Sequence, residues 1–96
     1  MSKPRTPTAS GISRLLAAAG HTRAVSKLRG GVSGYSVSKY GAGPAIEVRY
    51  SSISMGVSDE YRCSMLIRYV KTIAEAGYAA EPLIGPPRLI VTAKED

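Results

Sequence analysis

The chain has 96 residues, which is enough for one domain and too few for two. Its residues are 44% hydrophobic and 21% charged, as in an ordinary globular protein, and no apolar run approaches the roughly 18–20 residues that cross a bilayer. We therefore expect no membrane span and, from the opening MSKPRTPTASGIS, no signal peptide. A lone cysteine, Cys63, excludes an intrachain disulfide and favours a reducing cytoplasm.

The formal net charge of +6 is concentrated in one half of the chain. Residues 1–46 contain seven basic residues and no acidic one, whereas residues 47–96 contain six basic and seven acidic residues. A region of one sign raises the local electrostatic potential and attracts polyanions or acidic proteins. The sequence therefore points to nucleic acid or an acidic protein as the partner of the first half.

The first helix is expected directly after a short basic arm. Residues 1–7 hold two prolines and two charges, which predicts a mobile arm. The next apolar residues recur at i, i+3, i+4 and i+7, which predicts a helix over residues 9–19. These apolar residues are Ile12, Leu15, Leu16 and Ala19. Thr8 or Ser10 is the expected N-cap, and Gly20 fits the left-handed position that ends a helix.

Residues 21–31 (HTRAVSKLRGG) are consistent with two conformations. The β-branched residues and the Gly30–Gly31 pair favour a loop that leads into a strand, which is our interpretation. Ala24, Val25 and Leu28 also fit a short second helix. Together with the first helix this segment would make a helix–turn–helix, and the following hairpin would be its wing.

A β-hairpin follows, with strands predicted over residues 32–40 and 45–51. In the second strand Ile46 and Val48 alternate with charged residues, which is typical of a half-buried strand. The intervening residues 41–44 (GAGP) supply the glycines that a hairpin turn needs. The hairpin is therefore expected to have one buried side and one side that faces solvent.

The longest helix is predicted over residues 57–76. Ser58 is its expected N-cap, acidic residues follow in the first turn, and Gly77 ends it. Its apolar arc is wide enough to indicate burial on two sides, against the sheet and against the first helix. We expect Cys63, at the edge of this arc, to be a small core residue.

The remaining residues are expected to form one strand. Residues 78–87 contain three prolines and a glycine, which predicts an irregular connection. Residues 88–94 are β-branched and apolar at their centre, which predicts a strand. The sequence shows no internal repeat.

Together these elements predict a single α+β domain over residues 8–96, in the order α-β-β-α-β. The sheet is expected to have three strands, the hairpin plus the C-terminal strand, with both helices packed on one face. In this arrangement the last strand pairs beside the first strand of the hairpin. The other face is then open, and Lys39, Glu47 and Arg49 are candidates to line it.

The residue pattern supports neither catalysis nor metal binding. A metal site needs a cluster of ligands, but His21 and Cys63 lie alone on different elements. No serine stands in a Gly-x-Ser-x-Gly motif, and helix capping explains the adjacent carboxylates Asp59 and Glu60. The glycines of residues 29–43 fit neither a P-loop nor a dinucleotide fingerprint. We therefore expect a non-enzymatic binding protein without a metal or a cofactor.

The basic half favours nucleic-acid binding as the first hypothesis. Basic residues interleaved with tyrosines suit phosphate contacts and base stacking. The candidate nucleic-acid-binding residues are Arg14, Arg23, Lys27, Arg29, Lys39, Tyr35 and Arg49. The alternative is a protein–protein interaction module that uses the open sheet face or a hairpin edge. Its partner would be an acidic protein or a second copy of the chain.

Four short stretches share features with a known group of proteins. They are Ile12–Gly20 (ISRLLAAAG), Gly34–Val37 (GYSV), Glu75–Tyr78 (EAGY) and Leu89–Thr92 (LIVT). In order and spacing they resemble small uncharacterised proteins of actinobacteria and their bacteriophages. That group has no activity to carry over, and so no functional residue is transferred. The resemblance implies a cytoplasmic accessory protein that, if a phage encodes it, acts in the host cytoplasm on a host partner.

Overall fold

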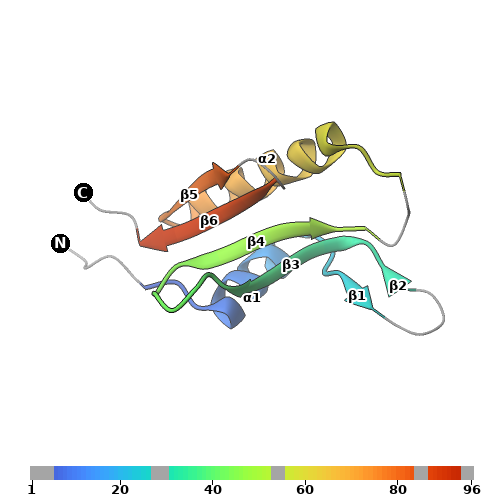
Figure 1. Cartoon of the computed structure of the whole chain (residues 1–96). Coiled ribbons are helices and arrows are strands. Elements are labelled where there is room, and N and C mark those ends of the chain that lie inside the picture. The colour runs from blue at the N-terminus through green and yellow to red at the C-terminus, as the bar shows by residue number, and fades with distance from the viewer. Residues whose placement is uncertain (1–5, 27–30, 53–55, 84–86, 94–96) are drawn as a thin grey trace.

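The structure is a computed structural model that describes residues 6–26, 31–52, 56–83 and 87–93. It is an α+β fold with two helices and a main antiparallel sheet (Figure 1). In chain order the elements are α1 (Ala9–Ala18), β1 (Val25–Ser26), β2 (Gly31–Val32), β3 (Gly34–Lys39), β4 (Ile46–Ser51), α2 (Asp59–Glu75), β5 (Tyr78–Leu83) and β6 (Arg88–Ala93). Of the predicted basic arm, residues 1–5 lie outside this description, and Pro7 is buried.

Both helices begin and end where the chain can satisfy the free backbone groups. Thr8 and Ser58 each accept a hydrogen bond from a first-turn N–H, at 3.0 Å and 3.1 Å. Beyond the C-terminal ends, Gly20 and Gly77 both take a φ of 93°, a left-handed conformation that residues with a Cβ atom avoid. The two predicted helices are thus confirmed, and their ends agree with the prediction to within two residues.

The main sheet has four antiparallel strands in the order β3-β4-β6-β5 (Figure 1). The predicted hairpin is present as β3 and β4, with Tyr35 opposite Tyr50. The predicted C-terminal strand is present as β6, but it pairs with β4 and not with β3. The predicted number of strands and their predicted order are therefore wrong. The edges of the sheet are β3 and β5.

The irregular connection predicted over residues 78–87 is wrong for its first part, because Tyr78–Leu83 is the strand β5 and forms a second hairpin with β6. Pro82 lies in this strand, opposite Leu89. Proline has no N–H to donate, so it is tolerated in a strand at the edge of a sheet, where one side of the backbone has no partner strand. Because β5 is an edge strand, Pro82 does not prevent its pairing with β6.

The segment that follows α1 is extended and not helical. The Ala24 N–H donates to the Tyr35 carbonyl at 2.8 Å, and the Tyr35 N–H donates to the Thr22 carbonyl at 2.9 Å. The segment therefore pairs with the outer edge of β3, and β1 and β2 then form a separate two-stranded sheet. The predicted loop is thus partly a strand. The helix–turn–helix alternative is wrong, because the described part of residues 21–31 contains no helix.

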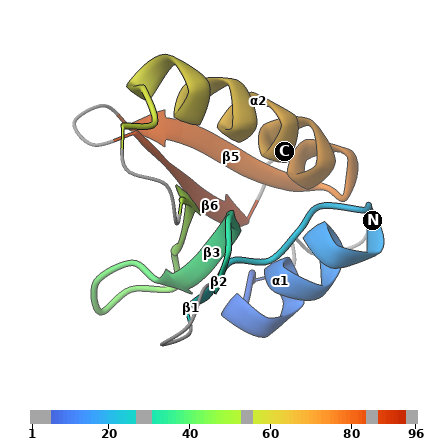
Figure 2. The same cartoon turned by 90° about the vertical axis from the view of Figure 1, so that its right-hand side faces the viewer.

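One hydrophobic core lies between the main sheet and the helices. Its buried members are Ile12, Leu16, Tyr35, Ile46, Val48, Leu66, Tyr69, Ile73, Leu89 and Val91. The members in β4 and β6 alternate along each strand and lie opposite one another, so they share one face of the sheet. Figure 2 shows α1 and α2 covering that face. Both helices therefore pack on one side of the sheet, as the sequence predicts.

The chain consists of two helix–hairpin halves, α1-β3-β4 and α2-β5-β6, with β1 and β2 inserted in the first. In each half the first strand of the hairpin is an edge strand and the second is central. When the chain is aligned on Gly20 and Gly77, the 10 residues of α1 match the C-terminal part of the 17-residue α2. Leu16 and Ile73 each lie four residues before these glycines, and both are fully buried. The structure thus contains a repeat that the sequence pattern did not reveal.

The sheet face opposite the helices carries Glu47 between two arginines. Its carboxylate forms ion pairs with Arg49 and, at 3.4 Å, with Arg88, and the side chains around it leave Glu47 only 9% exposed. Glu47 and Arg49 thus line the open face, as predicted. Lys39 does not, because it lies opposite the core residue Ile46 and therefore belongs to the helix side of the sheet.

Candidate nucleic-acid interface

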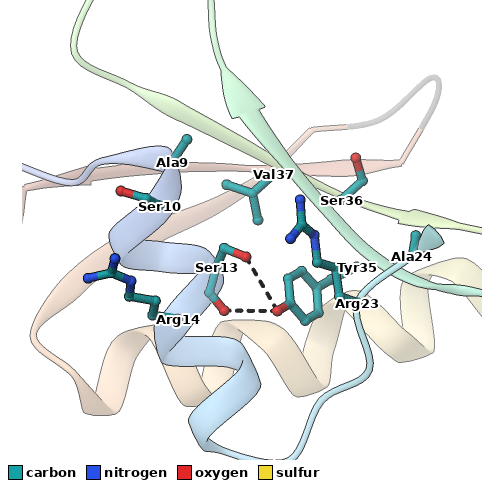
Figure 3. A pocket seen from close by; sticks show the side chains of 9 residues that line it. All are labelled: Ala9, Ser10, Ser13, Arg14, Arg23, Ala24, Tyr35, Ser36 and Val37. Carbon is teal, nitrogen blue, oxygen red and sulfur yellow. Dashed lines mark hydrogen bonds between the residues drawn. The ribbon is translucent and has the colours of Figure 1, made fainter. Parts of the chain in front are cut away.

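A pocket of about 360 Å³ lies between α1 and the edge strand β3, and we call it the α1–β3 pocket (Figure 3). Its wall is formed by Ala9, Ser10, Ser13, Arg14, Arg23, Ala24, Tyr35, Ser36 and Val37. The segment Thr22–Ala24 pairs with β3 only at Tyr35. The pocket therefore lies beside the point at which that segment leaves the strand edge.

The floor of this pocket is held in place by Tyr35. Its hydroxyl donates a hydrogen bond to the Ser13 carbonyl at 2.9 Å and lies 3.4 Å from the Ser13 hydroxyl (Figure 3). The Tyr35 side chain is only 1% exposed. A buried tyrosine that bonds from β3 to the backbone of α1 fixes the separation of these two elements. A contact within the protein therefore sets the spacing of α1 and β3 at the pocket.

Two guanidinium groups border the pocket, and none of the described residues that line it is acidic. Arg14 and Arg23 extend on either side of Ser13 in the view of Figure 3. Serine hydroxyls lie in the same wall, and α1 has no acidic residue in its first turn to offset the positive end of its dipole. Guanidinium and hydroxyl groups commonly bind phosphate oxygens. The chemistry of the pocket thus suits a phosphate group.

Three of the seven predicted site residues meet in this pocket, namely Arg14, Arg23 and Tyr35. The prediction that Tyr35 stacks on a base is nevertheless wrong, because its ring is buried in the core. The sequence shows only that a tyrosine lies in a basic region. The burial of the Tyr35 ring depends on its packing against α1 and against Tyr69 of α2. Local residue patterns do not predict such long-range packing.

The other predicted residues do not join this site. Arg49 lies on the open sheet face, where the carboxylate of Glu47 offsets its charge. Lys39 is exposed at the end of β3 and does not line the pocket. Lys27 and Arg29 fall outside the described residues, so the predictions about them stay predictions.

A second pocket of about 280 Å³ brings together side chains from four segments, and we call it the tyrosine pocket. It is lined by Gly20, His21, Thr22, Ser33, Gly34, Tyr50, Tyr61, Met65, Arg68 and Tyr69. Burial raises the pKa of Tyr69 to about 12. Burial, followed by a hydrogen bond with Tyr61, also raises the pKa of Tyr50. Both phenols therefore keep their protons at neutral pH. No pattern in the sequence indicates this cluster, because its members are far apart along the chain.

His21 connects the end of α1 to α2 beside the tyrosine pocket. Its Nε2 atom lies 2.8 Å from the Thr72 hydroxyl. Its ring meets the ring of Tyr69 edge to face, with the centroids 5.0 Å apart. The His21 side chain therefore holds the wall of the pocket in place.

A third concave surface, the apolar groove, lies between α2 and the β5–β6 hairpin and encloses about 440 Å³. It is lined by Asp59, Cys63, Leu66, Ile67, Val70, Pro82, Leu83, Pro87 and Leu89. Ile67 is 69% exposed here. Cys63 is also exposed, so its predicted place in the core is wrong. The apolar arc of α2 is wider than the surface that the sheet and α1 cover.

Within the described residues no group of three or more His, Cys, Asp or Glu side chains could hold a metal ion. Over the same part of the chain, no helix is long and apolar enough to cross a membrane. No protein-family model, curated protein or solved structure matches this chain. The assignment of a function therefore depends on the geometry and charge of the pockets themselves.

Proposed function

We propose that this protein binds nucleic acid through the phosphate backbone, with the α1–β3 pocket as its principal phosphate site. One observation supports this proposal most directly: two arginines, Arg14 and Arg23, border a preformed pocket that no described acidic residue lines. The excess of positive charge in residues 1–46 acts in the same direction, because it raises the potential around the pocket.

Binding in this mode depends on charge and not on base sequence. Each phosphate that an arginine neutralises releases condensed counterions, so affinity falls steeply as the salt concentration rises. The hydroxyls of Ser10 and Ser13 supply further hydrogen bonds to a phosphate between the two guanidinium groups. Lys39, exposed at the end of β3, adds positive charge on the same strand, and Lys27 and Arg29, which lie outside the described residues, stay predicted contacts.

The test is fluorescence anisotropy of labelled duplex DNA, single-stranded DNA and RNA at about 50 and about 200 mM salt, the range over which phosphate contacts are revealed. Wild-type protein should bind at least one of them with strong salt dependence. The double variant Arg14→Ser/Arg23→Ser should bind more weakly at low salt. If both side chains contact phosphates of a duplex, its log–log salt slope should also fall by about 2.

Lys71→Ser is the matched control. Lys71 lies six residues before Gly77, as Arg14 lies six residues before Gly20, and it is exposed and lines none of the three pockets. Its loss removes one positive charge from the equivalent helix position of the other half, and the salt slope should stay near that of the wild type. Undiminished binding by the double variant would remove the α1–β3 pocket from the proposal, and absence of binding by the wild type at low salt would overturn it.

A protein–protein interaction is the second candidate function, and the apolar groove favours it. Ile67 is 69% exposed in a groove whose other lining residues are mostly apolar. Exposed apolar patches on a small protein often mark a contact surface. In this case the partner is a second copy of the chain or a protein of the host cell, as the resemblance to phage proteins implies.

Ile67→Lys tests this candidate, because it places a charge in the groove while leaving the buried core unchanged. Light scattering should show a wild-type dimer that this variant abolishes, or a pull-down from nuclease-treated lysate should lose a partner that the wild type retains. A wild-type protein that stays monomeric and captures no partner would contradict the candidate.

A further inference from the structure

The tyrosine pocket has the size and the surface of a site for one planar ring. Its volume of about 280 Å³ lies at the lower end of the roughly 300–1,000 Å³ found for ligand pockets. The aromatic side chains of Tyr50, Tyr61 and Tyr69 form part of its wall. A pocket of this size is too small for a dinucleotide cofactor and is comparable to a nucleobase with part of its sugar.

Tyr61 offers this pocket an accessible aromatic ring. It lies in the first turn of α2 and is 49% exposed. Tyr50 from the end of β4 packs against it edge to face, with the centroids 5.5 Å apart and the rings inclined at 73°. This contact holds the Tyr61 ring in one orientation while part of its surface stays accessible. Such a ring can stack on a base of any identity.

Tyr69 brings an unused hydrogen-bonding group to the same wall. Its side chain is 1% exposed, and its hydroxyl has no hydrogen-bond partner among the described residues. Buried polar groups are nearly always paired, and an unpaired one calls for an explanation. A carbonyl oxygen or ring nitrogen of a base, entering with a small shift of the wall, is an acceptor that would satisfy it.

Arg68 supplies the positive charge of the pocket. It is exposed on α2, and none of the described lining residues is acidic. A guanidinium beside an aromatic ring can bind the phosphate attached to a stacked base. The pocket therefore combines a stacking ring, an unpaired donor and a phosphate-binding cation.

We propose that the tyrosine pocket takes up one unpaired base of a nucleic-acid strand, which stacks on Tyr61 while Arg68 binds its phosphate. This inference rests on the proposed nucleic-acid binding and adds a preference to it: a base inside a duplex cannot enter the pocket, so single strands or unpaired ends are bound more tightly than duplex. The chain continues from His21 and Thr22 in this pocket to Arg23 and Ala24 in the α1–β3 pocket, so one strand can engage both sites.

The test compares single-stranded and duplex oligonucleotides by fluorescence anisotropy with two pocket variants. Tyr61→Ala should weaken single-strand binding about 5- to 100-fold, the effect expected when one base–aromatic stacking contact is lost. Arg68→Gln should lower the single-strand salt slope by about 0.7, which corresponds to one phosphate contact. Neither variant should change duplex binding, because the pocket is not used by paired bases.

Tyr40→Ala is the matched control for Tyr61→Ala. Tyr40 directly follows the last residue of β3, is 39% exposed and lines none of the three pockets. Its loss should leave single-strand affinity unchanged. Equal effects of Tyr40→Ala and Tyr61→Ala would overturn the pocket assignment, and so would tighter binding of duplex than of single strand by the wild type.

Tyr69→Phe separates a binding role of the hydroxyl from a structural one. If the hydroxyl donates to a base, this variant binds single strands more weakly although its thermal melting temperature is equal or higher. Unchanged single-strand affinity would remove Tyr69 from the site. A parallel titration with a free mononucleotide identifies the source of the base. If the mononucleotide binds as tightly as an oligonucleotide, the proposal that the base belongs to a nucleic-acid strand is overturned.

Photo-crosslinking locates the base directly. Trypsin cleavage after Lys39, Arg49 and Arg62 places the control Tyr40 in one peptide and both Tyr50 and Tyr61 in the next. A single-stranded oligonucleotide that carries 5-iodouracil should therefore mark the peptide of residues 50–62 and not that of residues 40–49. Crosslinks confined to residues 40–49 would contradict the inference.

The two proposals fail in different ways. No binding of any nucleic acid by the wild type removes both of them. Binding that is lost in Arg14→Ser/Arg23→Ser and kept in Tyr61→Ala leaves the phosphate site in place and removes only the base pocket.

Discussion

The two helix–hairpin halves share one backbone plan and present opposite surfaces. Each half has a concave surface between its helix and the edge strand of its own hairpin. In the first half this is the α1–β3 pocket, which Ser10 and Ser13 line together with two arginines. In the second half it is the apolar groove, where the equivalent helix positions are Ile67 and Val70. The halves correspond in position and differ in chemistry.

This difference shows which features of the molecule set function. The shared features are the buried helix positions and the terminal glycines, which stabilise the fold in both halves. The features that differ are exposed side chains on the helices and edge strands. A repeated scaffold therefore provides two similar hollows, and a few surface residues decide whether a hollow attracts phosphate or an apolar partner.

The largest expected effect tests whether the two helices contribute equally to the free energy of unfolding through the core. Leu16→Ala and Ile73→Ala remove fully buried side chains at equivalent positions, and each should lower the free energy of unfolding by about 2–5 kcal/mol. Urea denaturation measures both. Ile67→Ala is the control, because its side chain is largely exposed and its loss should change little. A loss confined to one half would break the equivalence of the two helices.

The second effect tests the segment that only the first half contains. A Cβ atom on Gly34 would lie 2.0 Å from the Thr22 carbonyl oxygen, so Gly34→Ala forces the segment Thr22–Ala24 away from β3. We expect a loss of about 3 kcal/mol in unfolding free energy. Gly43→Ala meets no atom within 4 Å and serves as the control. Equal stability of the two variants would contradict the close packing of this segment.

The third effect comes from Tyr69, which can lose a proton, whereas Ile12 at the equivalent position in α1 cannot. The folded-state pKa of Tyr69 is raised from 10.0 to about 12. Between these values the unfolded chain has lost a proton that the folded chain keeps, so the unfolding free energy falls as the pH rises. The part of the fall that Tyr69 causes should reach about 2 kcal/mol. The fall should be smaller in Tyr69→Phe, where only the raised pKa of Tyr50 still contributes. Urea denaturation at about pH 9 and about pH 11.5 measures it. A similar alkaline loss in both proteins would show that other groups cause it.

The smallest effect compares the ends of the two helices. Gly20→Ala and Gly77→Ala place a Cβ atom at the same φ of 93°, with no neighbouring atom within 4 Å in either case. Each substitution should cost about 1–2 kcal/mol of unfolding free energy, because a left-handed backbone is unfavourable for alanine. Thermal melting of the two variants should show matching decreases. Clearly different decreases would show that the helix ends are not equivalent.

Predictability differed between local and long-range features. The N-caps Thr8 and Ser58 were predictable because each bonds to a backbone N–H only three residues away. The strand β5 was not, because Pro82 argues against a strand except at a sheet edge, and the edge position depends on β6 pairing with β4. The repeat was hidden for a similar reason: the two hairpins differ in their residues and only their arrangement in the sheet is alike.

The candidate site shows the same division. Charge alone indicated that Arg14 and Arg23 belong to a basic region, but their meeting in one pocket depends on the hydrogen bond from Tyr35 to the backbone of α1. The tyrosine pocket had no sequence signal, because it joins residues 20–22 to the start of β3, the end of β4 and one side of α2.

By itself the sequence determined the two helices, the first hairpin and the uneven distribution of charge. These features depend on residue composition or on hydrogen bonds and periodicities that span a few neighbouring residues. Only the tertiary structure decided the strand order, the fourth strand, the burial of Tyr35 and the composition of each pocket. Those features depend on which distant segments pair and pack, and side chains dozens of residues apart then share one surface.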